Sequence, residues 1–298
     1  MKRTPKILLI FILCAALCAC APAEEAQVAA TTLPVYQFTS LICQGTPVTV
    51  TRLVTESVSC LHDYTLTVRQ MRAIEGAEVV VLSGAGLEEF MEEALETAGT
   101  VVDASVGVTL LEGGCHHHHD EDEEEADHHD HEHELDSHIW LSPANARIMA
   151  ANICGGLCGV YPAYESTFRS NLEALDTRLA ELEAYANEQL TDLSTREIIT
   201  FHDGFSYLAQ AFDLEILEAI EEESGSEPSA QELIELIEMV EHHSVAAIFV
   251  ETNGSSSAAS VISAETGVPF FTLDMAMSGD DYFESMYHNI DTLKEALS

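Results

Sequence analysis

Residues 78–86 read Glu78-Val-Val-Val-Leu-Ser-Gly-Ala-Gly86. The run is short, rich in β-branched residues and closed by two glycines, which is typical of a strand buried on both faces of a parallel sheet. Helical segments are predicted on either side of it, over about 66–75 and over 87–98. A buried strand between two helices with short connections indicates an α/β fold.

The same alternation continues in both directions along the chain. Further strands are predicted before and after residues 78–83, at 28–32, 48–53, 100–103, 197–201, 215–219, 246–250 and 269–273. Between the two groups of strands, apolar side chains recur at spacings of four and three on one long amphipathic helix, namely Phe168, Leu172, Leu175, Leu179 and Leu182. We therefore expect two α/β lobes, 28–160 and 194–298, each with a parallel sheet flanked by helices, joined by one long rigid helix over 161–193.

The first residues have the features of an export signal. Lys2, Arg3 and Lys6 form a basic start, and residues 7–17 form an apolar run that is too short to span a bilayer. The run ends in Leu17-Cys-Ala-Cys20, which resembles the lipobox of bacterial lipoproteins. We expect a signal peptide over 1–19, lipidation at Cys20, a tether over 20–27 and a protein anchored outside the cytoplasm. An ordinary secretory signal cut nearby is the alternative.

The charge of the chain excludes several classes of partner. The 298 residues include 11 Lys and Arg against 52 Asp and Glu, a formal net charge of −41. Removal of the leader takes away Lys2, Arg3 and Lys6 and makes the charge −44. Such a surface repels nucleic acid and anionic membranes, so we expect no nucleic-acid partner and membrane contact through the lipid anchor only. A cation is the natural partner.

Residues 113–136 interrupt the α/β pattern. The segment holds eight histidines and eleven carboxylates and almost nothing apolar to bury, so we expect a loop. Its histidines are candidate low-affinity metal ligands: His116, His117, His118, His119, His128, His129, His131 and His133. The functional interpretation is a zinc collector near a tighter site. The alternative is a solvated insert with incidental affinity.

Three other histidines and one aspartate lie at the ends of predicted strands or in the turns that follow. They are His62, His138, His202 and Asp274. Ligands of open α/β sheets bind outside the carboxyl ends of the strands, so these four side chains form a candidate site. Three imidazoles and one carboxylate suit a four-coordinate zinc ion. The remaining histidines, His242, His243 and His288, fit surface or helix-end positions.

These motifs, in this order, resemble the metal-binding proteins of zinc and manganese ABC importers, the cluster A-I family. The matching segments are His62-Asp-Tyr64, Gly84-Ala-Gly-Leu-Glu-Glu-Phe90, His138-Ile-Trp-Leu-Ser-Pro143, Thr200-Phe-His-Asp-Gly-Phe-Ser-Tyr-Leu208, Phe249-Val-Glu251 and Leu273-Asp274. The resemblance implies a metal in a cleft between the lobes, with His62 and His138 from the first lobe and His202 and Asp274 from the second. It also implies a non-enzymatic protein that captures Zn²⁺ and delivers it to an ABC permease, and we expect a monomer.

Two alternatives remain open at this point. Manganese members generally carry Glu at the position of His202, and a three-histidine site favours zinc over a manganese-type component. A secreted zinc hydrolase could use the same ligands, but the chain has no His-Glu-x-x-His motif, and Glu251 is more simply interpreted as the end of a buried strand. The segment Met275-Ala-Met-Ser-Gly279 differs from the Pro-rich continuation that is usual in the family.

Cysteines add two expectations. In an oxidising compartment Cys43 and Cys60 are the first pair to test for a disulfide. Cys154 and Cys158 lie four residues apart in a predicted helix, where we expect them to pack as small apolar side chains.

Overall fold

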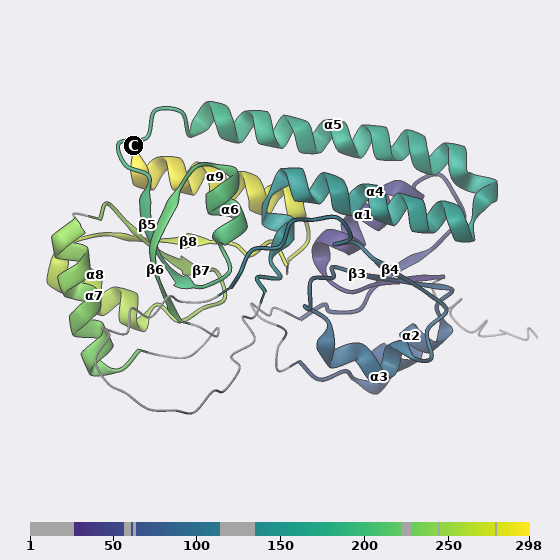
Figure 1. The fold of residues 1–298 in the computed structure, drawn as a ribbon, viewed down its shortest axis with the longest axis horizontal. Coiled ribbons are helices and arrows are strands. Elements are labelled where there is room, and N and C mark those ends of the chain that lie inside the picture. Colours follow the sequence, from purple (N-terminus) through teal and green to yellow (C-terminus); the bar gives the residue numbers. More distant parts are fainter. Residues whose placement is uncertain are drawn as a thin grey trace, which may run out of the picture.

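The computed structural model describes residues 27–56, 61, 64–113, 135–221, 228–243, 245–277 and 279–298. They form two α/β lobes, shown side by side in Figure 1. Several features that the sequence predicts lie outside the described residues: the leader over 1–19, Cys20, His62, Cys60 and the eight loop histidines.

The first lobe is built on a parallel four-stranded sheet with the order β2-β1-β3-β4. The strands are β1 (Val28–Ala30), β2 (Val50–Arg52), β3 (Val79–Leu82) and β4 (Thr100–Asp103). The helices are α1 (Leu33–Cys43), α2 (Val68–Gly76), η1 (Glu89–Met91), α3 (Glu92–Leu95), η2 (Ile139–Leu141) and α4 (Pro143–Val160). The central strands β1 and β3 are buried, as the continuous apolar run at 79–82 predicts.

The second lobe repeats this architecture, with a parallel sheet of order β6-β5-β7-β8. Its strands are β5 (Glu197–His202), β6 (Glu215–Glu221), β7 (Ile248–Glu251) and β8 (Phe270–Leu273). Its helices are α6 (Ser206–Ala211), α7 (Ala230–His243), α8 (Ser257–Thr266) and α9 (Tyr282–Leu297). In both sheets the two central strands are therefore the first strand of the lobe and the third.

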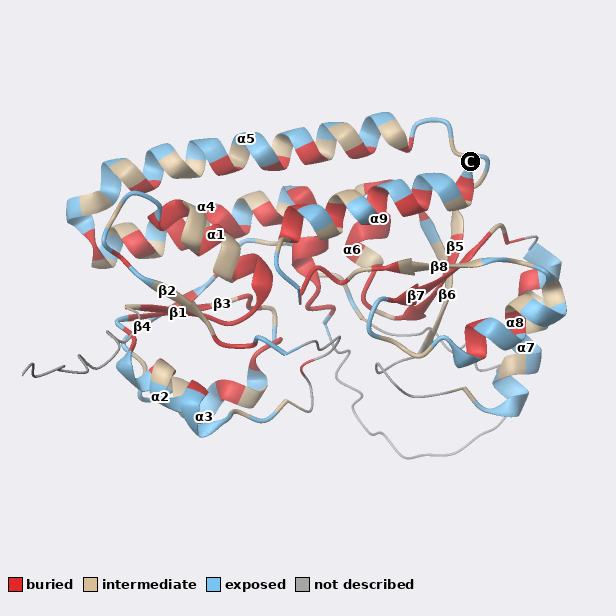
Figure 2. Ribbon diagram, turned by 180° about the vertical axis from the view of Figure 1, so that it is seen from behind, coloured by how far each residue is buried: buried red, intermediate tan, exposed pale blue. Residues whose placement is uncertain are grey.

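One long helix spans both lobes. After the short turn η3 (Pro162–Tyr164), helix α5 (Glu165–Gln189) runs over α1, α4 and α9 in Figure 1. The predicted apolar stripe is confirmed, because Phe168, Leu175, Leu179 and Leu182 are buried and Leu172 is partly buried against the same core. Buried residues continue from one lobe into the other beneath this helix (Figure 2), so the lobes share one apolar core.

The segment that leads from β8 to α9 also connects the lobes. The Leu33 amide donates to the carbonyl of Met277 at 3.3 Å, and the Arg52 guanidinium donates to the carbonyls of Met277 and Gly279 at 3.0 and 2.7 Å. The Tyr282 hydroxyl donates to the carbonyl of Trp140 at 2.7 Å in the core. Residues of the second lobe are thereby fixed against the first.

The helix predicted over 87–98 is shorter than expected. Only η1 and α3 form there. The residues before them, Gly84, Ala85 and Gly86, all have positive φ and turn the chain sharply. A side chain at Gly84 would also collide with the Asp103 carboxylate, at 2.0 Å from its β-carbon position.

The described cysteines, Cys43, Cys154 and Cys158, are free thiols. The sulfur atoms of Cys154 and Cys158 lie 3.9 Å apart on α4, and burial raises the pKa of Cys43 and of Cys154 to about 12. No helix in the described part of the chain has the length and apolar character to cross a bilayer.

Candidate metal centre

His202 is the last residue of β5, at the carboxyl end of a central strand, as its position in the sequence predicts. Its side chain is buried, and its Nδ1 lies 3.3 Å from Oε1 of Glu251, the last residue of the neighbouring strand β7. Gly204 makes room for the ring: a β-carbon at that position would lie 2.5 Å from Cδ2 and 2.7 Å from Nε2 of His202. The imidazole therefore packs directly against backbone on one side and a carboxylate on the other.

His138 comes from the first lobe and lies directly before η2 and α4. The Asp136 carboxylate accepts from the His138 backbone amide at 2.8 Å and contacts its Nδ1 at 2.9 Å. The next residues are held rigidly, since Ser142 caps α4 and Trp140 is fully buried against the His138 ring, with the ring centroids 5.4 Å apart. Sequence-local contacts thus fix both the position and the orientation of this imidazole.

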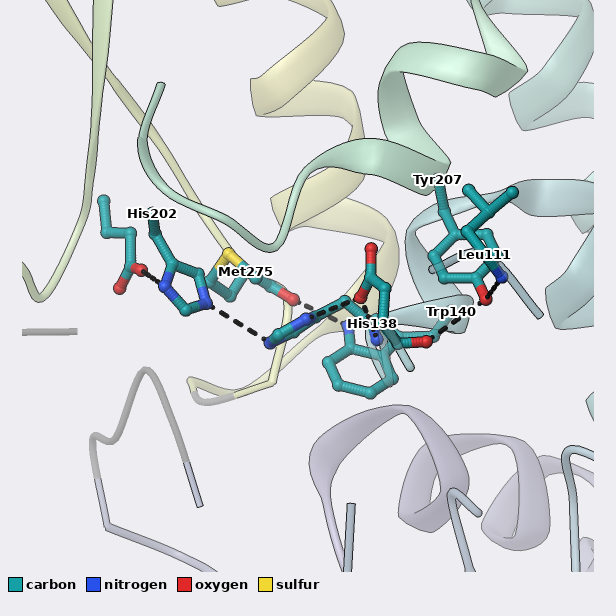
Figure 3. Close-up of polar contacts among 8 residues, drawn as sticks. Leu111, His138, Trp140, His202, Tyr207 and Met275 are labelled. Carbon is teal, nitrogen blue, oxygen red and sulfur yellow. Dashed lines mark hydrogen bonds and ion pairs between the residues drawn. The ribbon is translucent and has the colours of Figure 1, made fainter. Parts of the chain in front are cut away.

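The two imidazoles face each other across the junction of the lobes (Figure 3), with their Nε2 atoms 3.4 Å apart and their ring planes at 89°. An ionised carboxylate can only accept, so a histidine that donates Nδ1–H to it presents a lone pair at Nε2. With both imidazoles in this tautomer, the two lone pairs repel unless a proton or a cation lies between them. In a tetrahedral zinc site with Zn–N distances of 2.0–2.1 Å, two nitrogen ligands lie about 3.3 Å apart. The observed separation fits this geometry.

The other predicted ligands are placed differently. Asp274 directly follows β8, and its carboxylate accepts from the Ala276 amide at 2.7 Å and from the Ser285 hydroxyl at 3.2 Å. Among the described residues no group of three or more His, Cys, Asp or Glu side chains is placed to share one ion. The structure therefore brings His138 and His202 together, holds Asp274 in local hydrogen bonds and does not describe His62. The exposed histidines His242, His243 and His288 lie away on α7 and α9.

Further contacts across the lobes support the pair. The Trp140 indole donates to the carbonyl of Met275 at 2.7 Å, in the segment after β8. The Tyr207 hydroxyl of α6 donates to the carbonyl of Asp136 at 3.2 Å and accepts from the Leu111 amide at 2.9 Å. All three contacts are drawn in Figure 3. Burial raises the pKa of Tyr207, so its hydroxyl stays protonated and can donate.

Three residues of this site were not assigned a role from the sequence: Asp136, Glu251 and Gly204. Asp136 could have been found, because an acid two residues before a histidine can reach Nδ1 within one turn. Glu251 ends β7 as predicted, but its contact with His202 depends on the pairing of β5 with β7, which the sequence does not show. Glycine is required at 204 because the His202 ring lies against its backbone, and no pattern in the neighbouring sequence predicts this contact.

Comparisons with known proteins identify the family of the chain. A family model described as ZnuA, the periplasmic component A of zinc-uptake complexes, matches residues 28–296. The zinc-binding lipoprotein AdcA of Streptococcus pneumoniae is 30% identical over 97% of this chain, which spans 60% of that lipoprotein's length.

Solved structures show the same fold. The Zn(II)-bound ZnuA-like domain of Streptococcus pneumoniae AdcA superposes with a TM-score of 0.76 at 27% identity, covering 92% of this chain and 99% of that domain. The metal-dependent lipoprotein YcdH of Bacillus subtilis gives a TM-score of 0.75 at 26% identity, with 91% and 98% covered. The matched family model covers both lobes and both facing histidines, and the chain therefore belongs to the ZnuA family of zinc-uptake components.

Proposed function

We propose that this protein captures Zn²⁺ outside the cytoplasm and delivers it to the permease of an ABC importer. The observation that carries the proposal is the pair of Nε2 atoms 3.4 Å apart, each on an imidazole whose Nδ1 contacts a buried carboxylate. Such carboxylate–histidine pairs orient the ring and raise its basicity at a metal. The zinc-binding relatives support the choice of ion, as do nitrogen donors, which suit zinc better than manganese.

The complete ligand set that we propose is His62, His138, His202 and Asp274. Asp274 remains chemically competent in its present hydrogen bonds, because each carboxylate oxygen has a second lone pair. Its partner Ser285 lies on α9. The Asp274 backbone amide also donates to the side-chain oxygen of Asn289 on the same helix, at 2.7 Å. The aspartate is thus tied to a helix that packs between the lobes.

The histidine-rich segment has an anchor beside the site. Glu112 and Leu135 form an antiparallel bridge, and the Asp136 amide donates to the carbonyl of Leu111 at 3.0 Å. The chain on the two sides of the segment is therefore paired two to three residues before His138. We propose that its histidines collect Zn²⁺ at low affinity and raise its concentration near the tight site.

We further propose that the mature chain begins at a lipidated Cys20, acts as a monomer and has no catalytic role. Activity towards peptide, ester or phosphate substrates in the zinc-loaded protein would instead favour the hydrolase alternative. The proposed role of the histidine-rich segment is tested by metal analysis after deletion of residues 115–134. The deletion should remove the weakly bound zinc ions and leave one tightly bound ion per protein.

The central test is zinc titration of His138→Ala and His202→Ala against a competing chelator at fixed pH. Each variant should lose the tightly bound zinc ion, because too few ligands remain to hold it. The matched control is His288→Ala, an exposed histidine on α9, which should bind like the native protein. Tight binding of one zinc ion by both His138→Ala and His202→Ala would contradict the proposal.

A further inference from the structure

The thioether of Met275 lies beside the pair of histidines, His138 and His202, and has no role in the proposed zinc site. Met275 is the residue after the candidate ligand Asp274, and it is almost fully buried, with 5% of its surface exposed. In Figure 3 its side chain lies beside the His202 imidazole. It is the one sulfur-containing side chain among the residues drawn there.

The space around Gly204 fixes how close the two groups are. A β-carbon at Gly204 would lie 2.7 Å from Nε2 of His202 and 2.7 Å from the Met275 methyl carbon. The metal-binding nitrogen and the end of the thioether are therefore separated by no more than twice that distance. Since Met has three rotatable side-chain bonds, rotation about them can turn its sulfur towards an ion held by Nε2.

The backbone of Met275 cannot move away easily. Its carbonyl accepts from the buried Trp140 indole at 2.7 Å, and Trp140 itself packs on the His138 ring. The same contact network that orients His138 thus holds the thioether beside His202. The adjacent carboxylate of Asp274 accepts hydrogen bonds from Ala276 and Ser285. The second lobe therefore offers the ion two donor atoms besides His202, a carboxylate oxygen and a thioether sulfur.

We propose that Met275 is a specificity-determining residue of the metal centre, in which its thioether acts as a soft donor and favours softer ions such as Cd²⁺ relative to Zn²⁺. Thioether sulfur is a soft ligand, whereas carboxylate oxygen is a hard one. A purely apolar cap would exclude water and strengthen the binding of both ions alike. A sulfur donor changes the ratio of the two affinities. This inference rests on the proposed function, since it requires that His202 holds the ion.

The test compares Met275→Leu with Met277→Leu. Both residues are buried in the same segment, and Met to Leu conserves volume, so both variants should fold. Affinities for Zn²⁺ and Cd²⁺ are measured by chelator competition. In Met275→Leu we expect Cd²⁺ affinity to fall about tenfold while Zn²⁺ affinity changes less than threefold, as for loss of one soft contact. Met277→Leu should leave both affinities unchanged.

An unchanged ratio in Met275→Leu, or an equal fall for both ions, overturns the inference but leaves the zinc proposal standing. A native protein without tight Zn²⁺ binding overturns the zinc proposal itself. A second readout avoids dependence on affinity: with ¹³C-labelled methionine methyls, Cd²⁺ should shift the Met275 resonance and leave that of Met277 in place. No shift at Met275 on saturation with Cd²⁺ also overturns the inference.

Discussion

The two sheets place polar side chains at equivalent points, yet the two clusters differ in kind. In the first lobe Thr31 and Ser83 follow the central strands β1 and β3. The Thr31 hydroxyl and the Ser83 backbone amide donate to the buried carboxylate of Glu88, at 2.6 and 2.7 Å. In the second lobe His202 and Glu251 end the central strands β5 and β7. The first cluster closes on itself, since the Gly84 amide also donates to Glu88 at 3.0 Å.

The second cluster instead directs Nε2 of His202 away from its own sheet and towards the first lobe. Glu251 contacts Nδ1 of His202, and the other nitrogen points at His138 across the junction of the lobes. A carboxylate that accepts three donors stabilises a loop, whereas a carboxylate that orients an imidazole prepares a ligand. The position at the strand ends is therefore not sufficient for a site. What distinguishes the candidate metal centre is a pair of imidazole nitrogens that face each other, each a potential metal ligand.

Among changes that leave every proposed ligand in place, the largest effect on zinc affinity should follow Gly204→Ala. A β-carbon 2.7 Å from Nε2 displaces the His202 ring, so we expect affinity to fall by more than the roughly 10- to 100-fold that loss of an outer partner costs. The control is Gly155→Ala, at an exposed position of α4 with no atom near the added carbon. The control should bind zinc normally and gain about 0.5–1 kcal/mol of stability. Native zinc affinity in Gly204→Ala would show that the ring position is not critical.

A smaller effect should follow loss of either orienting carboxylate. Asp136→Asn and Glu251→Gln keep the shape but remove the negative charge beside Nδ1, and each should weaken zinc binding about 10- to 100-fold with one tight equivalent retained. The contact of Asp136 is shorter, 2.9 Å against 3.3 Å, so its variant should be affected more. Titration calorimetry gives both affinity and stoichiometry. Unchanged affinity in both variants would assign the carboxylates a purely structural role.

The smallest effect on zinc should follow Glu88→Gln, which should leave zinc affinity as it is and change the pH dependence of stability. Burial raises the pKa of Glu88 to about 7 despite its three donors, and the nearby Asp103 adds to this. The folded state therefore binds more protons than the unfolded state between the usual carboxyl pKa and about 7, so native stability should fall as pH rises through that window.

The native fall should be on the order of 3 kcal/mol. Denaturant unfolding of the zinc-free protein at pH 5 and pH 8 measures it, and Glu88→Gln should show a flatter profile. An identical pH dependence in the variant would mean that Glu88 does not titrate in this range.

The sequence predicts the fold well because local patterns decide it. The apolar run at 79–82 and the spacing of Phe168, Leu175 and Leu179 correspond to a buried strand and to the buried face of α5. The helix predicted over 87–98 is wrong in length, since only η1 and α3 form there. The sharp turn before it, with positive φ at Gly84, Ala85 and Gly86, carries Glu88 back to Thr31 and Ser83, contacts that periodicity does not show.

The site is only partly readable in the sequence. His138 and His202 could be predicted from their places beside strands and helices, and the structure brings them together. The role of Glu251 required the order of strands in the sheet, and the place of Met275 required the path of the chain after β8. Both depend on contacts between residues far apart in the chain, for which periodicity carries no information.

The central claim is that one zinc ion binds between the facing nitrogens of His138 and His202. A crystal structure of the zinc-loaded protein, with anomalous data collected on both sides of the zinc absorption edge, tests it most directly. The account predicts a single strong anomalous peak about 2.0–2.1 Å from Nε2 of each histidine. A strong zinc peak elsewhere in the molecule, with none between these two nitrogens, would contradict it.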